Sequence, residues 1–290
     1  MDRQERAALA RETLKILERG YYRAESGRRV EIEDEVARAV DDARLYKPEE
    51  LEEIAAGLKG SPGEASSAEM EITVSEETTL QAAERLVQEG EYEETACLNF
   101  ASAYNPGGGF LEGSGAQEES LARSSALYPT IEQMEEMYEA NRQYGSSLYL
   151  DYMIYSPEVP VIRRDEGDLL EEPFKVSFIT APAVNAGAVK ENEPRENVER
   201  IEPVMVGRIE KLLALAVEEK VEALVLGAFG CGVFQNDPEM VADIFRRFLY
   251  RDERFRQAFA RVVFAVRDSS AGKKTLKAFE KKLESDEIRS

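Results

Sequence analysis

The chain has 290 residues, carries a formal net charge of −21 at neutral pH and contains no histidine. A protein this acidic repels phosphate on average, so we expect no direct binding to nucleic acid, and a polyanionic ligand must be held by backbone N–H groups or a few cationic side chains. The lack of histidine excludes Ser–His and Cys–His nucleophile pairs, and because the two cysteines, Cys97 and Cys231, are far apart in the sequence, we expect no metal site.

Residues 1–60 are predicted to form a helical extension. Its expected elements are a helix that ends at Gly20, a hairpin that turns at Ser26–Gly27, and helices near 34–44 and 48–58. The turn-rich, polar segment 59–69 is the predicted linker to a core at 70–290. The N-terminal segment is charged from its second residue, and no apolar stretch approaches the ~18–20 residues of a membrane span. We therefore expect a cytoplasmic protein that does not contact membranes.

From residue 70 on, strand patterns alternate with helix patterns. Strands are predicted at 70–75, 95–100, 152–162, 174–181, 221–229 and 261–266. Helices are predicted at 79–89, from about Gln117, and at 130–142, 195–219, 238–249 and 273–285. This alternation predicts an α/β sandwich whose central strands are buried on both faces. Ligands of such sheets bind at the carboxyl ends of the strands, where both glycine-rich loops of this sequence fall.

The first glycine-rich loop, 105–115, follows a buried strand and runs into a helix. Its consecutive glycines, Gly107, Gly108 and Gly109, allow the backbone to approach a ligand closely and to adopt positive φ. The first turn of the helix reads Gln117, Glu118, Glu119. Since histidine is absent, such carboxylates are the candidates for acid–base catalysis, although the helix dipole also favours acidic residues in a first turn without any catalytic role.

This arrangement of GGG, a short gap and QEE resembles the signature of poly(ADP-ribose) glycohydrolases of the compact bacterial type, which are built on a macro domain. The resemblance covers most of the chain and includes the segment RETLKILERGYY near the N-terminus. It implies a macro-domain-like mixed central sheet between helices, with the N-terminal extension packed on the core. The implied reaction is hydrolysis of ribose–ribose O-glycosidic bonds, which releases ADP-ribose without a cofactor. The implied partners are poly(ADP-ribose), ADP-ribose and ADP-ribosylated proteins.

The resemblance also implies a role for each polar residue of this region. Glu119 matches the catalytic glutamate, which would protonate the leaving ribose hydroxyl and then activate water as a carboxylate. Glu118 would bind ribose hydroxyls, and Gln117 would brace the loop or the neighbouring ribose. Adjacent residues of a helix point about 100° apart, so the two glutamates cannot lie on opposite sides of one bond. Asn99 and Asn105 match residues that contact the distal ribose, although Asn105 beside Pro106 is equally a good turn residue.

The second glycine-rich loop follows the most apolar predicted strand and precedes a helix start at Asp237–Pro238. A Rossmann-type nucleotide loop is the competing interpretation, but the GxGxxG spacing and the opening βαβ position are missing. The loop resembles the diphosphate loop of macro domains, in which backbone N–H groups and a helix N-terminus hold the phosphates. The substrate-binding residues implied here are Gly227, Ala228, Phe229, Gly230, Cys231, Gly232, Val233 and Phe234.

Three residues of these regions have alternative interpretations. Phe234 would press the ribose onto the first loop, or it is an ordinary core aromatic. Pro182 and Asn185 would border the adenine, or they belong to a plain turn. Two other functions also stay open: a non-catalytic ADP-ribose-binding macro domain, and a hydrolase of mono-ADP-ribosylated targets.

Overall fold

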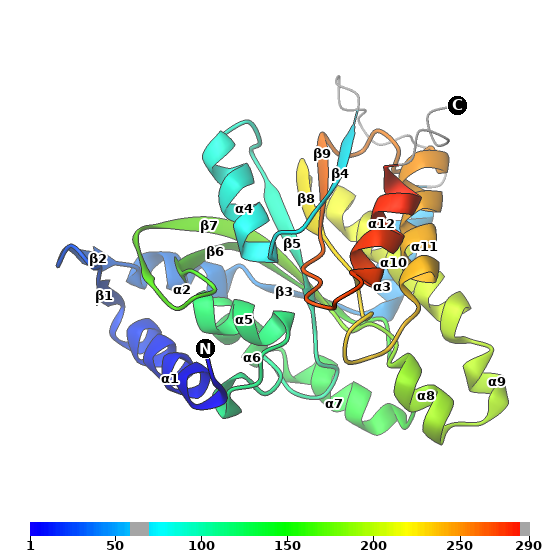
Figure 1. Ribbon diagram of the computed structural model, residues 1–290, viewed down its shortest axis with the longest axis horizontal. Helices are drawn as coiled ribbons and strands as arrows, with labels where there is room; N and C mark the ends of the chain where they lie inside the picture. The colour runs from blue at the N-terminus through cyan, green and yellow to red at the C-terminus, as the bar shows by residue number, and fades with distance from the viewer. Residues whose placement is uncertain (59–69, 285–290) are drawn as a thin grey trace.

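The computed structural model describes residues 1–58 and 70–284, and the predicted linker at 59–69 lies outside the described residues. The strands of the central sheet are β3 (Arg44–Tyr46), β4 (Glu71–Ser75), β5 (Thr95–Phe100), β6 (Met153–Arg163), β7 (Leu169–Ala181), β8 (Ala223–Leu226) and β9 (Arg261–Ala265). They lie in the order β3-β6-β7-β5-β8-β9-β4 (Figure 1). The pairs from β7 through β5, β8 and β9 to β4 are parallel, whereas β6 pairs antiparallel with both β3 and β7. The mixed sheet predicted from the sequence is confirmed.

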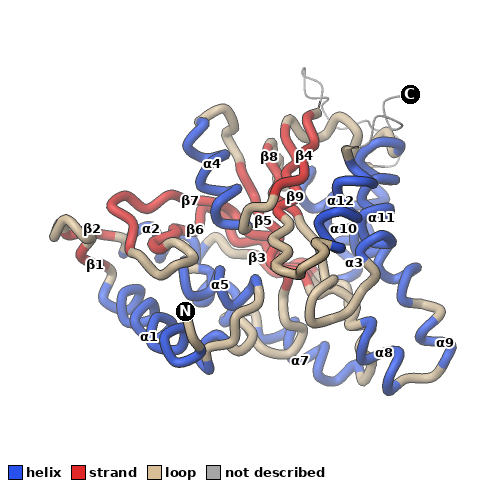
Figure 2. The backbone as a smooth tube through the Cα atoms, viewed as in Figure 1, coloured by secondary structure: helices blue, strands red, loops and turns tan. Residues whose placement is uncertain are grey.

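Helices cover both faces of this sheet (Figure 2). They are α1 (Arg3–Arg19), α2 (Glu33–Asp41), α3 (Pro48–Gly57), α4 (Thr79–Glu89), α5 (Gln117–Ser124), α6 (Leu127–Glu132), α7 (Glu135–Tyr144), α8 (Ala186–Asn192), α9 (Arg195–Val198), α10 (Ile201–Glu218), α11 (Pro238–Arg251) and α12 (Lys274–Leu283). One apolar cluster joins the sheet to α3, α10, α11 and α12, and a second joins it to α2, α4, α5, α6 and α7. Along β5, Ala96 and Leu98 belong to the first cluster and Cys97 to the second, so both faces of this strand are buried.

The N-terminal extension contributes more than helices to the core. Helix α1 ends at Gly20, which adopts a left-handed conformation with φ 75°, as the sequence predicts. The predicted hairpin is confirmed by the pairing of β1 (Tyr21–Arg23) with β2 (Arg29–Glu31). Strand β3, which the sequence pattern did not predict, pairs with β6 and is an edge strand of the central sheet. Helix α1 packs against α5 and against η1 (Phe110–Glu112), a 3-10 turn in the first glycine-rich loop.

Several predicted elements are shorter in the structure. The helix predicted at 130–142 is divided into α6 and α7, because Met134 leaves the helical region with ψ 49°. The helix predicted at 195–219 is divided into α9 and α10. The strand predicted at 221–229 ends at Leu226, since the chain turns at Gly227, where a Cβ would lie 2.7 Å from the carbonyl oxygen of Ala265. The apolar pattern continues through 227–229 because these residues pack close to the core after leaving the sheet.

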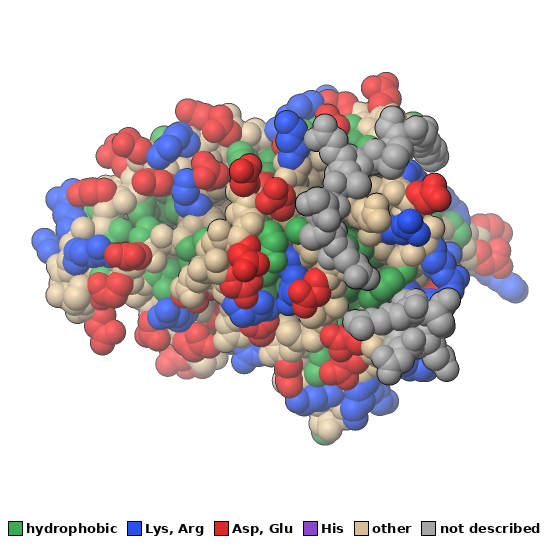
Figure 3. All heavy atoms as spheres, turned by 90° about the horizontal axis from the view of Figure 1, so that it is seen from above, with side chains coloured by type: hydrophobic (Ala, Val, Ile, Leu, Met, Phe, Trp, Pro, Cys, Tyr) green, Lys and Arg blue, Asp and Glu red, His purple; other side chains and the backbone are tan. Residues whose placement is uncertain are grey.

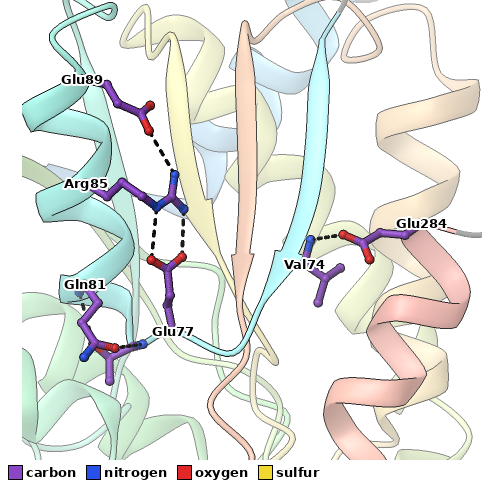
Figure 4. A network of polar contacts seen from close by, with 7 residues as sticks. Val74, Glu77, Gln81, Arg85, Glu89 and Glu284 are labelled. Atoms are coloured by element: carbon purple, nitrogen blue, oxygen red, sulfur yellow. Dashed lines mark hydrogen bonds and ion pairs between the residues drawn. The ribbon is translucent and has the colours of Figure 1, made fainter.

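The turn between β4 and α4 is fixed by a polar network (Figure 4). The guanidinium of Arg85 binds Glu77 through Nε at 3.1 Å and Nη2 at 2.8 Å, and Nη1 contacts Glu89 at 3.4 Å. Thr78 caps α4 by accepting the N–H of Gln81 at 3.1 Å, and the Gln81 side chain accepts the N–H of Thr78 at 3.0 Å. This capping box holds the N-terminus of α4 near the carboxyl end of β5.

The surface agrees with the acidic composition. Figure 3 shows carboxylate side chains spread over one face of the molecule, with lysine and arginine side chains between them. Within residues 1–58 and 70–284, no helix combines the length and the apolar character needed to cross a bilayer.

Candidate active site

The two glycine-rich loops meet at the carboxyl ends of the parallel strands, because they follow β5 and β8, which are neighbours in the sheet. A cleft of about 1480 Å³ opens at these strand ends. This volume exceeds the roughly 300–1,000 Å³ of pockets that hold a drug-sized ligand. The cleft wall also includes residues of the N-terminal segment, the turn before α4, the β6–β7 hairpin and the segment after β9.

Glu118 lies in the first turn of α5, and only 3% of its surface is exposed. Its Oε2 accepts the backbone N–H of Ser102 at 2.7 Å, and its Oε1 accepts Nδ2 of Asn99 at 3.3 Å. Asn99 is itself fully buried, and its Nδ2 also donates to Thr180 Oγ1 at 3.1 Å. Burial raises the pKa of Glu118 to about 8, because desolvation of the carboxylate outweighs these hydrogen bonds. Glu118 therefore keeps its proton at neutral pH and can donate a hydrogen bond to a ligand.

The raised pKa of Glu118 predicts that the stability of the wild type, relative to Glu118→Gln, falls between pH 5 and pH 8. Below pH 4.5, the ordinary value, the carboxyl is protonated in both the folded and the unfolded chain and costs nothing. As the pH rises from there to about 8, the unfolded chain releases the proton and the folded chain retains it. The wild type then loses up to about 1.4 kcal/mol of stability per pH unit, whereas the variant does not. Urea unfolding at pH 5 and pH 8 measures the free energy of unfolding of both proteins. If the wild type and the variant differ by the same amount at both pH values, the prediction is contradicted.

Glu119 is the next residue of α5 and is partly exposed in the cleft. Its Oε1 accepts the backbone N–H of Gly109 at 3.1 Å. Its Oε2 is buried and has no hydrogen-bond partner in the part of the chain that the structure describes. Gly108 adopts φ 57°, and a Cβ at this position would lie 2.5 Å from Glu119 Oε1. The carboxylate can take this position only because residue 108 has no side chain.

Gln117 ties the start of α5 to the end of β5. Its Oε1 accepts the backbone N–H of Phe100 at 2.9 Å, and its Nε2 donates to the carbonyl of Leu98 at 2.7 Å. The same Nε2 lies 3.1 Å from the hydroxyl of Thr79, in the first turn of α4. Through one amide, the strand end and two helix starts are therefore fixed relative to one another.

Asp165, in the hairpin between β6 and β7, fixes α5 from the other side. Its Oδ1 accepts the hydroxyl of Ser120 at 2.7 Å, and its Oδ2 accepts the hydroxyl of Thr78 at 2.6 Å. One oxygen of this carboxylate therefore holds the start of α5, which carries Glu119, and the other holds the start of α4. Asp165 lines the cleft, but its oxygens are committed to these two helix starts.

The second glycine-rich loop presents backbone donors to the cleft. Gly230 has φ 71°, and a Cβ there would lie 2.5 Å from Ala183 Cβ and 2.6 Å from Asn236 Nδ2. Asp237 caps α11 by accepting the N–H of Glu239 at 2.9 Å, as the sequence predicts. Within the described residues, five cleft-lining members of this loop have backbone N–H groups that donate no hydrogen bond: Ala228, Gly230, Gly232, Val233 and Phe234. Unused N–H groups before a helix N-terminus suit an anionic ligand.

Most of the residues predicted from the sequence line the cleft. These are Asn105, Gly108, Gly109, Gln117, Glu118, Glu119, Ala228, Gly230, Cys231, Gly232, Val233 and Phe234. Val233 is 76% exposed, which is unusual for a valine and leaves its side chain free for a ligand. Burial raises the pKa of the Cys231 thiol to about 12, so this thiol is a poor nucleophile.

The other predicted residues are not part of the cleft wall: Asn99, Gly107, Pro182, Asn185, Gly227 and Phe229. Asn99 lies beneath Glu118 and holds it, instead of facing the cleft itself. The carbonyl of Pro182 accepts Nη1 of the buried Arg208 at 3.0 Å, and Asn185 caps α8 by accepting the N–H of Ala188 at 3.0 Å. These contacts place both residues in the connection between β7 and α8, and their contact with the adenine stays a prediction.

Sequence reasoning missed several cleft residues: Arg6, Thr78, Arg123, Asp165 and Arg267. They come from five segments of the chain: α1, the turn before α4, α5, the β6–β7 hairpin and the segment after β9. Only the folded chain brings them together, so no spacing signal in the sequence could have found them.

The family model described as the catalytic domain of microbial-type PARG matches residues 10–164. The crystal structure of poly(ADP-ribose) glycohydrolase from Thermomonospora curvata matches with a TM-score of 0.91 and 48% identity, and covers 97% of this chain and 100% of that chain. The same enzyme bound to the inhibitor ADP-HPD matches with a TM-score of 0.88 and 47% identity, with the same coverage of both chains. The Deinococcus radiodurans enzyme in complex with ADP-ribose matches with a TM-score of 0.79 and 43% identity, and covers 86% of this chain and 96% of that chain.

A search of the curated proteins found no significant match. The family model alone covers more than half of the chain, and its matched region contains both glutamates and the loop that holds them. The Thermomonospora curvata enzyme matches the fold over nearly the full length. The chain therefore belongs to the microbial-type poly(ADP-ribose) glycohydrolases.

Proposed function

We propose that this poly(ADP-ribose) glycohydrolase uses Glu119 as the general acid and base that cleaves the ribose–ribose bond. The observation that carries the proposal is the asymmetry of the carboxylate. The Gly109 N–H holds Oε1 at 3.1 Å, whereas Oε2 has no partner among the described residues. A carboxylate oxygen without a partner can exchange a proton with the leaving oxygen of a bound substrate when the side chain turns it from its buried position into the cleft.

The reaction requires a proton for the departing ribose hydroxyl and a water molecule for the anomeric carbon. Glu119 delivers the proton from Oε2 and, as a carboxylate, then accepts a proton from the attacking water. Glu118 holds the sugar by hydrogen bonds to its hydroxyls, and its buried partners Asn99 and Ser102 fix its orientation. Asp165 takes no proton in this scheme, because both of its oxygens already accept hydrogen bonds from helix starts.

We assign the diphosphate of ADP-ribose to the second glycine-rich loop. The free N–H groups of Gly230, Gly232, Val233 and Phe234 and the N-terminus of α11 support this assignment. An acidic protein can bind a doubly charged group in this way without a cluster of lysines. The complex of the Deinococcus radiodurans enzyme with ADP-ribose supports ADP-ribose as the ligand. The exposed Val233 and its neighbour Phe234 would then pack against the distal ribose.

Gly230→Ala tests this loop and is expected to weaken ADP-ribose binding at least about tenfold. The new Cβ would clash with Ala183 and Asn236, and the backbone would be strained at φ 71°. The loop must shift, and its N–H groups then no longer converge on the phosphates. Calorimetric titration with ADP-ribose measures the effect. Gly232→Ala is the matched control, since a Cβ there meets nothing within 4 Å, and equal losses in both variants would contradict the assignment.

The substrate is tested by comparing ADP-ribose release from poly(ADP-ribose) with release from singly ADP-ribosylated protein. Faster release from the polymer supports the proposed function. Release only from the singly modified protein would make the chain a mono-ADP-ribosyl hydrolase. Binding of ADP-ribose with no release from either would make it a reader, but a reader has no need for an acid at Glu119. ADP-ribosylated proteins as partners and a cytoplasmic location are part of this proposal.

A further inference from the structure

Two arginines line the cleft near Glu119 and have no role in the chemistry described above. Arg6 comes from α1, and its Nε donates to the carbonyl of Gly113 at 2.8 Å. Arg123 lies one helical turn after Glu119 on α5, is 4% exposed, and donates from Nη1 to the carbonyl of Ser114 at 2.8 Å. Arg6 Nη1 also donates to the carbonyl of Met1 at 2.9 Å, so Nη2 is the Arg6 nitrogen that remains for a ligand, whereas Arg123 keeps Nε and Nη2.

Neither arginine makes an ion pair within 4.0 Å in the described part of the chain, although the protein carries a net charge of −21. Burial and the nearby positive charge of Arg6 lower the pKa of Arg123, and they outweigh the opposite effects of Glu119 and Asp165. Two like charges beside each other destabilise the free protein unless an anion lies between or near them. An anionic group in this part of the cleft would relieve this repulsion.

The two arginines come from α1 and α5, and neither belongs to the second glycine-rich loop. Helix α1 packs against α5 and η1 at the β6 side of the sheet, whereas the second loop follows β8 (Figure 1). Glu119 also lies on α5, four residues before Arg123, and lines the same cleft. When the diphosphate of the terminal ADP-ribose binds to the second loop, the leaving group is the rest of the polymer. This leaving group then lies beyond Glu119, toward Arg6 and Arg123. The cleft volume of about 1480 Å³ is large enough for both the terminal ADP-ribose and a part of the leaving group.

We propose that Arg6 and Arg123 form a subsite for a phosphate of the next ADP-ribose unit of the polymer, on the leaving side of the scissile bond. This inference rests on the proposed function. A planar guanidinium fork matches phosphate oxygens in two-point hydrogen bonds, and Arg6 is the member whose side chain is exposed enough to make them. The subsite would favour polymer over substrates whose leaving group lacks phosphate.

The test compares Arg6→Gln with Arg3→Gln. Arg3 precedes Arg6 on α1 and donates from Nε to the carbonyl of Glu112 at 2.9 Å, so both variants lose one positive charge and one bond to the same loop. Only Arg6 lines the cleft. The substrates are poly(ADP-ribose) and a synthetic aryl glycoside of ADP-ribose, whose phenol leaving group carries no phosphate. Thermal unfolding of both variants checks that α1 stays folded.

Arg6→Gln is expected to raise KM for the polymer about tenfold, the effect of losing one charged hydrogen bond, and to flatten the dependence of KM on salt. In Arg6→Gln, KM for the aryl glycoside should change less than twofold. In Arg3→Gln, KM should stay unchanged for both substrates. Equal losses on both substrates would overturn the subsite, since Arg6 would then act through the carbonyl of Gly113. Unchanged polymer kinetics would overturn it as well. A wild-type protein that cleaves neither substrate would overturn the proposed function, and the subsite with it.

Discussion

Glu119→Gln is expected to slow the release of ADP-ribose from polymer by a factor between about 10² and 10⁴, the usual contribution of a general acid. The amide keeps the shape of the side chain and can still accept the Gly109 N–H, but it has no proton to give to the leaving oxygen. Affinity for ADP-ribose should stay within a few-fold, because the phosphates are held by the second loop. Single-turnover kinetics and calorimetry measure the two quantities separately.

Glu112→Gln is the control for this variant. Glu112 also lines the cleft, lies in the same loop region, and loses the same charge on substitution. It is exposed and has no part in the proposed reaction, so turnover should be retained. A Glu119→Gln enzyme with more than a tenth of the wild-type rate would remove Glu119 from the chemical step. A collapse of ADP-ribose affinity in the same variant would show instead that the residue shapes the pocket.

Local sequence patterns were enough to predict the main parts of this site. Neighbouring residues in the sequence predict the glycine-rich loop at 107–109, the helix start at Gln117 and the helix cap at Asp237. The alternation of strands and helices then places both glycine-rich loops at the carboxyl ends of the strands. The family resemblance then selected Glu119 from many carboxylates. No periodicity distinguishes one glutamate of a first turn from the other.

The parts that could not be predicted depend on contacts between distant segments. The bond from Thr13 Oγ1 to the carbonyl of Arg123 spans 110 positions and helps to fix α1 on α5. The approach of Arg6 to the first glycine-rich loop depends on the same packing. Asn99 was expected to face the sugar, but strand pairing places its Nδ2 against Thr180 and Glu118. Such contacts are properties of the packed sheet and helices, and helix or strand patterns do not encode them.

Gly108→Ala is expected to lower the polymer cleavage rate about 100-fold even though the substitution adds one methyl group. Its Cβ would lie 2.5 Å from Glu119 Oε1, whereas carbon–oxygen contacts are normally about 3.3 Å or longer, so the carboxylate must move by nearly 1 Å. A displacement of about 1 Å from the reactive geometry typically costs a factor on the order of 10² in rate. The measurement is kcat on polymer, together with the free energy of unfolding.

The strain of a non-glycine residue at φ 57° would by itself cost about 1–2 kcal/mol of stability, and this has to be separated from the loss of activity. Gly145→Ala provides the separation. Gly145 ends α7 with φ 74°, and a Cβ there meets nothing within 4 Å. It should show a similar loss of stability with full activity, because only Gly108 lies against the carboxylate. If the two variants lose activity equally, the glycine at 108 serves the backbone alone, and the position of Glu119 does not depend on it.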